Sequence, residues 1–356
     1  MINGSAIVLT NGWLKERHAK TAHGLLRGSQ RFKILGIVDP VFAGKTTREI
    51  FPFLNTDIPV FKEVSQSLEK LSEKPDYCII GVALHGGILP TSFRKEIIQA
   101  MQGGISIVSG LHTQINDDPE FRAIAQEYQV DLIDVRKPPP LEQRYFWRGQ
   151  SLEIKTPRIA LLGMDCVIGK RTTGNILKDT CEKNGIRTEF IYTGQTGWMQ
   201  GLRYGFIFDA TVNDFISGEI ERQITLCHEE ADPELILIEG QSSLRNPSGP
   251  CGSEFILSGN CKGVILQHAP GRKYFDGMED LKIAIPSVKE EVDLIKYYGA
   301  RTLAITLNEE NISENKLQEY QGKLQKKLSI PVVRPLNGEL QELLPVIREY
   351  VDQYAK

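Results

Sequence analysis

The stretch IALLGMDCVIGKRTT, residues 159–173, decides the fold of the second half of this chain. Its apolar residues predict a buried strand, a turn bounded by Gly163 and Gly169 follows, and Lys170 opens a helix. In such a turn the backbone N–H groups and the positive end of the helix dipole point inward and bind an anion. The lysine adds a charge that phosphate oxygens can share. The stretch therefore predicts a phosphate-binding loop at the end of a parallel strand.

A second apolar run, residues 235–238, ends in Glu239 and Gly240, where a Walker-B-type carboxylate would lie. We expect Glu239 to orient a Mg²⁺-bound water or to act as a general base, the alternative being a paired strand-end acid. The usual phosphate loop is G-x-x-x-x-G-K-[ST], but here Arg171 takes the position of the metal-binding hydroxyl and Thr172 comes one place late. Thr172 and Glu239 are the expected Mg²⁺ ligands. The expected cofactor-binding residues are Gly163, Asp165, Gly169, Lys170, Arg171, Thr172 and Thr173.

Composition bounds the class of protein. The 356 residues are 41% hydrophobic and 24% charged, as in ordinary globular proteins, and the net charge of −3 argues against a general nucleic-acid surface. The six cysteines form no C-x-x-C pair and are too sparse for a disulfide framework, so we expect reduced thiols in a cytoplasmic protein. The sequence shows no signal-peptide pattern and no apolar run long enough to span a membrane, so we do not expect a membrane protein. A small-molecule substrate is the expected partner, and open sheet edges allow a homo-oligomer.

The pattern along the chain predicts two α/β domains. Short apolar runs separated by helical stretches such as 94–101 and 120–128 are typical of a parallel sheet with helices on both faces. Prolines 138–140 break this pattern, and it begins again at residue 159. We therefore predict a domain over residues 1–140, a linker over 141–156 and a phosphate-loop domain over 157–356. The predicted strands are 6–9, 34–38, 77–82, 105–108 and 132–135, then 159–162, 189–192, 235–238, 263–267, 302–307 and 331–333.

Polar residues that follow other strands of the second domain are further site candidates, because ligands bind at the carboxyl edge of open α/β sheets. Residues 193–197, TGQTG, predict a pliable polar loop, in which Gln195 and Thr196 would contact substrate. Arg245 and Asn246 follow Glu239 and could hold a substrate carboxylate. The expected catalytic residues are Lys170, Glu239, Asp214 and His268, although Asp214 could simply cap a helix and His268 could be a structural hydrogen-bonding group.

The first domain gives weaker signals. Asp39 ends the second strand, where a ribose-binding acid can lie, but the glycine fingerprint of dinucleotide-binding folds is absent after the first strand, so NAD binding is not predicted. A second Gly-Lys-Thr-Thr, at residues 44–47, lacks the leading glycine of a phosphate loop, and Pro52 shortens any helix after it. We therefore do not expect this second motif to bind phosphate.

Several motifs together resemble known proteins. The loop from Gly163 to Lys170 is similar to that of dethiobiotin synthetase and its relatives, in which a strand-end Glu-Gly also recurs. With residues 109–112 (SGLH), 134–139 (DVRKPP), 193–197 and 238–241 (IEGQ), the whole chain resembles a bacterial and archaeal family known as a domain of unknown function. That resemblance implies a Rossmann-like N-terminal domain and a P-loop C-terminal domain. Some members of the family resemble D-glutamate N-acetyltransferases.

Three functions stay open on this basis. The first is a phosphate-loop enzyme that binds ATP and Mg²⁺ and acts on a small carboxylate or amino acid. The second is N-acetyl transfer from acetyl-CoA to an amino acid such as D-glutamate, with the loop holding the coenzyme A phosphates. The third is a nucleotide-binding subunit without catalysis, which Arg171 in the hydroxyl position would favour.

Overall fold

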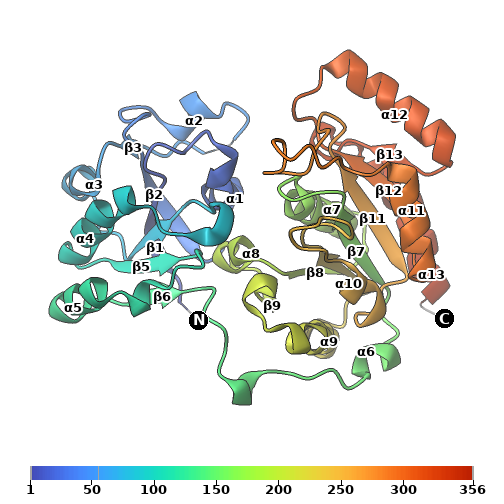
Figure 1. The fold of residues 1–356 in the computed structure, drawn as a ribbon, viewed down its shortest axis with the longest axis horizontal. Helices are drawn as coiled ribbons and strands as arrows, with labels where there is room; N and C mark the ends of the chain where they lie inside the picture. Colours follow the sequence, from blue (N-terminus) through green and yellow to red (C-terminus); the bar gives the residue numbers. More distant parts are fainter. Residues whose placement is uncertain (1, 55, 355–356) are drawn as a thin grey trace. The chain divides into compact units, whose positions relative to one another are not determined.

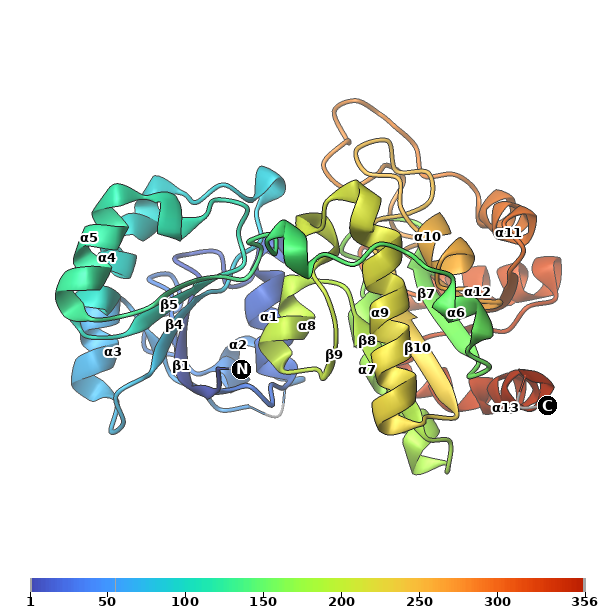
Figure 2. The ribbon, with the colours of Figure 1, turned by 90° about the horizontal axis from the view of Figure 1, so that it is seen from below.

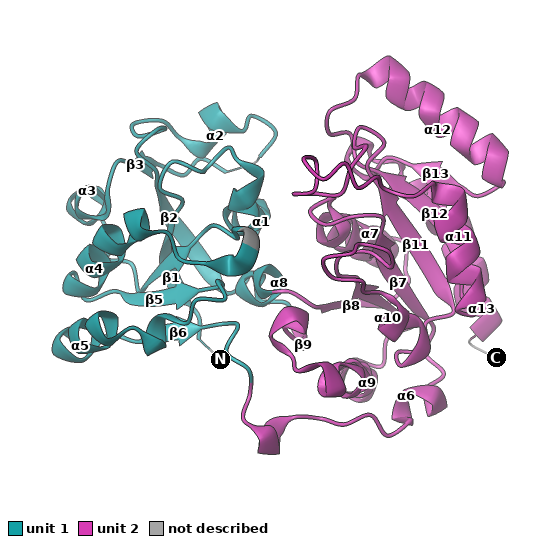
Figure 3. Cartoon of the chain, viewed as in Figure 1, with its two compact units in different colours: residues 1–138, 195–202 teal, residues 139–194, 203–356 magenta. Residues whose placement is uncertain are grey.

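The computed structural model describes residues 2–54 and 56–354, which form two compact units. Residues 1–138 and 195–202 make the first unit, and residues 139–194 and 203–356 make the second (Figure 3). Each unit is built on one all-parallel sheet, so the prediction of an α/β protein with two parallel-sheet domains is confirmed. No helix within the described residues is both long and apolar enough to span a membrane.

The first unit has six strands in the order β3-β2-β1-β4-β5-β6, the arrangement of Rossmann folds (Figure 1). The order changes direction between β1 and β4, where such folds place ligands. β3 is a two-residue edge strand that the sequence pattern did not reveal. The strands are β1 (Gly4–Leu9), β2 (Phe32–Val38), β3 (Val60–Phe61), β4 (Tyr77–Ile80), β5 (Ser106–Ser109) and β6 (Leu132–Asp134).

Side chains of β1 alternate between the two faces of this sheet. Ile7 and Leu9 pack on one face with residues of α4 and α5, while Ala6 and Val8 pack on the other with residues of α1. Predicted helices 94–101 and 120–128 are confirmed as α4 and α5. The helices of the unit are α1 (Lys20–Arg27), α2 (Thr47–Ile50), α3 (Val64–Lys70), α4 (Arg94–Gln102), α5 (Pro119–Tyr128) and α8 (Gln195–Gln200).

Helix α8 belongs to the first unit although both segments that flank it belong to the second. The chain leaves the second unit after Gly194 and returns to it at Arg203. Met199 is fully buried in the first unit. The guanidinium carbon of Arg31 lies 4.3 Å from the centroid of the Trp198 ring. The prediction of a pliable loop over residues 193–197 is therefore wrong from Gln195 onward, because the apolar residues after it anchor a helix.

The second unit has seven strands in the order β13-β12-β11-β7-β10-β8-β9. β7 lies centrally between β10 and β11, so the turn that follows β7 lies where the connections diverge to opposite sides of the sheet. β9, with two residues, was again not predicted. The strands are β7 (Arg158–Gly163), β8 (Thr188–Tyr192), β9 (Tyr204–Gly205), β10 (Leu235–Glu239), β11 (Gly263–His268), β12 (Arg301–Leu307) and β13 (Val332–Val333).

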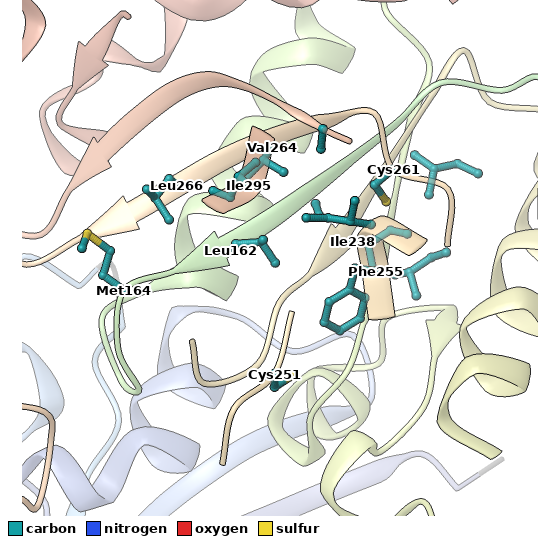
Figure 4. Close-up of a cluster of buried hydrophobic side chains, with 14 of the residues drawn as sticks. Leu162, Met164, Ile238, Cys251, Phe255, Cys261, Val264, Leu266 and Ile295 are labelled. Atoms are coloured by element: carbon teal, nitrogen blue, oxygen red, sulfur yellow. The ribbon is translucent and has the colours of Figure 1, made fainter. Parts of the chain in front are cut away.

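A continuous apolar core covers one face of this sheet. Leu162 of β7, Ile238 of β10 and Leu266 of β11 contribute to it, together with Phe255 of α10 and Ile295 of α11 (Figure 4). Figure 2 shows α9 lying along the strands of this unit. The helices of the unit are α6 (Gln150–Glu153), α7 (Lys170–Lys183), α9 (Asn213–Ala231), α10 (Ser253–Leu257), α11 (Val288–Tyr297), α12 (Glu314–Leu328) and α13 (Leu344–Tyr354).

Candidate functional site

The turn between β7 and α7 has the backbone of a phosphate loop. β7 is buried along its whole length and ends at Gly163, and α7 begins at Lys170. Val167 and Gly169 adopt positive φ angles of 51° and 98°. A positive φ is costly for a β-branched residue such as Val167, and such angles make successive amides of a turn converge on one side.

Amides of this loop are left without protein partners. Within residues 2–54 and 56–354, the backbone N–H groups from Val167 to Thr172 donate no hydrogen bond. The next amide, that of Thr173, donates to the Gly169 carbonyl and starts the ladder of α7. A run of unpaired donors at the positive end of a 14-residue helix is an arrangement that favours an anion.

The Lys170 side chain folds back over the loop. Its ammonium donates to the carbonyl oxygens of Asp165 at 2.7 Å and Ser242 at 2.9 Å. A Cβ atom at position 163 would lie 2.8 Å from Lys170 Nζ, so the lysine can take this path only because residue 163 is glycine. Burial lowers the pKa of Lys170, since its charge is removed from water and bonded only to carbonyl groups. An anion bound to the loop would compensate that charge.

Asp165 braces the loop from inside. One carboxylate oxygen accepts from the Cys166 amide at 2.7 Å, and the other accepts from Arg272 Nη1 and from the Asp276 amide, each at 3.0 Å. Burial raises the pKa of Asp165, and these hydrogen bonds act in the opposite direction. Arg272 also donates to the carbonyl oxygens of Cys166 and Val167, so it fixes the shape of the turn. This role of Arg272 could not be read from the sequence, where it lies far from the loop.

Arg171 and Glu239 form an ion pair beside the loop. Glu239 ends β10 and is buried, with Oε1 accepting from Arg171 Nη1 at 3.3 Å and Oε2 accepting from the Thr193 amide at 3.1 Å. The two threonines behind Arg171 differ. Thr173 donates to the buried Gln267 side chain at 2.7 Å, whereas Thr172 is half-buried and makes no hydrogen bond through its side chain to the described part of the chain.

The predicted substrate residues after Glu239 have structural partners. Asn246 Nδ2 donates to Asp165 Oδ1 at 3.4 Å, so Asn246 contacts the loop itself. Arg245 Nε donates to Glu291 Oε2 of α11 at 2.7 Å, and the Glu291 side chain is buried. Arg245 Nη2 is buried and has no partner in the described residues. Both assignments stay predictions.

The two further catalytic candidates occupy different environments. His268 is buried at the end of β11, with Nε2 hydrogen-bonded to the Tyr320 hydroxyl at 2.9 Å. Burial lowers the pKa of His268 to about 4, so its ring is neutral near pH 7. Asp214 is exposed in the first turn of α9, whose N-terminus lies at the carboxyl edge of the sheet because α9 connects the parallel strands β9 and β10.

Gln195 and Thr196 lie in α8 and so in the first unit. Gln195 Oε1 accepts from Arg136 Nη2 at 3.1 Å, and the Gln195 side chain fills the space that a Cβ at Gly110 would occupy. The hydroxyl of Thr196 lies 3.3 Å from that of Thr21. Both residues are buried, and their contact with substrate stays a prediction.

Family models match both halves of the chain. A P-loop domain described as the C-terminal domain of DUF1611, a domain of unknown function, matches residues 145–344. A Rossmann-like domain described as the N-terminal domain of the same family matches residues 40–138. A solved DUF1611 family protein from Anabaena variabilis is 27% identical with a TM-score of 0.86, and the match covers 99% of this chain and 100% of that one.

Two curated relatives carry the name D-glutamate N-acetyltransferase. The protein from Tritonibacter scottomollicae is 30% identical over 282 residues, which are 76% of this chain and 81% of the relative. The protein from a Pseudoalteromonas species is 27% identical over 273 residues, covering 75% of this chain and 79% of the relative. Together with the family models, these matches confirm the family resemblance of the sequence.

Proposed function

The chain belongs to the DUF1611 family, with a Rossmann-like and a P-loop domain, and on this premise we propose that it is an N-acetyltransferase. It would transfer the acetyl group of acetyl-CoA to the amino group of a small acidic amino acid, of which D-glutamate is the leading candidate. The phosphate loop would bind the coenzyme A phosphates rather than a nucleotide that is consumed.

The run of unpaired amides from Val167 to Thr172, with the Lys170 ammonium beside it, carries this proposal. Coenzyme A bears a pyrophosphate and a ribose phosphate, so it offers several anionic oxygens to such a loop. Backbone amides are preorganised donors, and hydrogen bonds to a charged acceptor are stronger than those between neutral groups. Binding through the phosphates leaves the thioester free to reach an acceptor amine elsewhere.

The choice of acetyl transfer is supported by the relatives. Both proteins named D-glutamate N-acetyltransferase align with about three quarters of this chain. The loop geometry thus supports a phosphorylated ligand, and the names of the relatives support acetyl-CoA as that ligand.

The reaction itself requires a neutral amine, because an ammonium has no electron pair with which to attack a thioester. A base removes the proton, the nitrogen bonds to the carbonyl carbon, and the carbon–sulfur bond breaks to release coenzyme A. The thioester lies at the opposite end of coenzyme A from the phosphates. In this proposal Lys170 and Glu239 therefore act in binding, and Asp214 and His268 remain the candidates for the base.

A thiol-release assay tests the proposal directly. Purified protein with acetyl-CoA should release free thiol with D-glutamate, and more slowly or not at all with L-glutamate, D-alanine and D-lysine. Calorimetric titration of coenzyme A and of ATP with Mg²⁺ gives a second measurement. A flat amino-acid panel together with binding of ATP·Mg²⁺ but not coenzyme A would contradict the proposal and favour the ATP-dependent alternative. Nucleotide binding without any turnover would favour the non-catalytic one.

A further inference from the structure

A phosphate loop normally holds Mg²⁺ with the Ser or Thr that follows its lysine and with a Walker-B acid. In this chain those two positions are Arg171 and Glu239. A guanidinium has no acceptor atom and cannot be a metal ligand. Both oxygens of Glu239 already accept hydrogen bonds, from Arg171 and from the Thr193 amide. The residues at the metal position therefore do not fit Mg²⁺.

Neighbouring oxygen atoms do not replace the missing ligand. The Thr173 hydroxyl donates to Gln267, whose Oε1 also accepts from Thr306. Both Asp165 oxygens are occupied by the contacts that brace the loop. Thr172 follows the usual position by one residue, which turns its side chain about 100° around the helix axis. No group of three or more His, Cys, Asp or Glu side chains that could hold a metal occurs among residues 2–54 and 56–354.

We propose that the Arg171 guanidinium takes the place of Mg²⁺, so that this loop binds its polyphosphate ligand without metal. The Arg171 side chain is 19% exposed and that of Glu239 is 6% exposed, so the pair lies at the edge of the loop where one side of the guanidinium can face a phosphate. Arginine is always charged, and its planar fork matches phosphate oxygens in pairs. Glu239 holds the opposite side through its Oε1, and the Thr193 amide in turn fixes Glu239 by donating to its Oε2, which makes Glu239 a positioning residue for Arg171.

This inference names the ligand through the proposed function, but the absence of a metal requirement holds for any polyphosphate. It also predicts which form of the ligand this loop prefers, the free polyanion or its Mg²⁺ complex. A loop with a built-in cation binds the free polyanion, whereas loops that depend on Mg²⁺ bind the metal complex. This loop should therefore bind the metal-free polyphosphate, whereas the loop of an ATP-dependent enzyme binds the less negatively charged Mg²⁺ complex.

Calorimetric titration of the full chain with coenzyme A, in excess EDTA and in millimolar Mg²⁺, tests the inference. The wild-type dissociation constant should change less than about threefold between the two conditions, and Arg171→Thr should weaken binding about 10- to 100-fold in EDTA. Arg171→Lys keeps the charge without the fork and should fall between them. Lys178→Thr is the matched control, because it removes one charge from the same helix, where Lys178 pairs with Glu189 away from the loop.

Adding Mg²⁺ should restore part of the affinity of Arg171→Thr, since the new hydroxyl occupies the usual ligand position. Wild-type binding that needs Mg²⁺, or Arg171→Thr binding as tightly as wild type in EDTA, would overturn the inference. The same titrations with ADP separate the two proposals. Failure with coenzyme A but metal-free binding of ADP would remove the acetyltransferase proposal and keep this one. Failure of both ligands in EDTA would overturn this one.

Discussion

In the first unit the loop after β1 closes around a carboxylate of the protein itself, whereas in the second unit the loop after β7 closes around an ammonium. Asp39, fully buried at the end of β2, accepts from the Thr10 hydroxyl at 2.7 Å and from the amides of Gly12 and Leu14 at 2.8 and 3.1 Å. In the second unit Lys170 is bonded to carbonyl oxygens, and the loop amides from Val167 to Thr172 have no acceptor in the described residues.

The comparison shows how two similar strand–loop–helix turns acquire different roles. In the first unit the position of the ribose-binding acid of dinucleotide folds is used to satisfy the loop amides, so the loop has an internal anion. In the second unit a fixed cation and unpaired amides remain, so the anion must come from outside. Four variants break or sharpen this contrast, and they follow in order of decreasing expected effect.

Lys170→Ala removes the buried ammonium of the second loop. We expect coenzyme A to bind at least about 100-fold more weakly, a loss of about 3 kcal/mol, because a charge-assisted contact to phosphate disappears. The free energy of unfolding should not fall in parallel, because burial of Lys170 disfavours its charged form. Calorimetry and chemical denaturation measure the two quantities. Unchanged affinity would remove the distinction between the loops.

Acid should destabilise the protein through His268. Burial lowers the pKa of His268 from 6.5 to about 4, so between these values the unfolded chain binds more protons and stability falls as the pH falls. His268→Gln, which can still bond Tyr320, should reduce that loss by about 2.5 kcal/mol across this window. Denaturant titrations at both ends of the window measure it. Burial also lowers the pKa of His23, which bonds the Leu14 carbonyl in the first unit, so His23→Gln is the matched comparison.

Asp39→Asn tests the internal anion of the first loop. We expect a loss of about 2 kcal/mol in the free energy of unfolding, because the amides of Gly12 and Leu14 lose a charged acceptor. Coenzyme A affinity should stay within about twofold of wild type, a change of less than about 0.5 kcal/mol, because the proposed ligand binds the loop after β7 and not the loop that Asp39 closes. Asp57→Asn is the control, because Asp57 is exposed in the same unit. A large fall in affinity with Asp39→Asn would show that the first loop also serves the ligand.

Gly163→Ala tests the path of the lysine. The added Cβ would lie 2.8 Å from Lys170 Nζ and 2.9 Å from its Cδ, so the flexible side chain must shift away from its carbonyl partners. We expect coenzyme A to bind about tenfold more weakly, with little change in stability. Gly249→Ala is the control, since a Cβ there meets nothing within 4 Å. Equal effects of the two variants would contradict this account of the loop.

Local patterns were sufficient to predict the architecture. Apolar runs and turn residues located the five longer strands of the first sheet and six strands of the second. The motif at residues 163–170 located the turn between β7 and α7, in which Val167 and Gly169 have positive φ angles. The two-residue edge strands β3 and β9 were missed because so short a run has no period to detect, whereas the equally short β13 was predicted within residues 331–333. α8 was mistaken for a loop because Gly194 and Gly197 obscured the apolar pair Trp198 and Met199 that follows them.

Partners that depend on the fold could not be predicted. Arg272 lies 107 positions from Asp165, yet it fixes the turn through three contacts. Arg245 was expected to hold a substrate carboxylate, and nothing in the local sequence showed that its partner is Glu291 of α11. The Arg171–Glu239 pair could be suspected from the unusual position of Arg171, but only the sheet order brings the ends of β7 and β10 together.

The placement of α8 bears on how this protein can evolve. Because residues 195–202 complete the first unit while the chain on both sides belongs to the second, a gene cut at codon 138 would not separate two self-sufficient modules. The N-terminal product would lack Met199 from its core, and the C-terminal product would expose Trp198 and Met199 of α8 to solvent. Recombination that shuffles whole domains is therefore penalised here, and the two halves are expected to be inherited together.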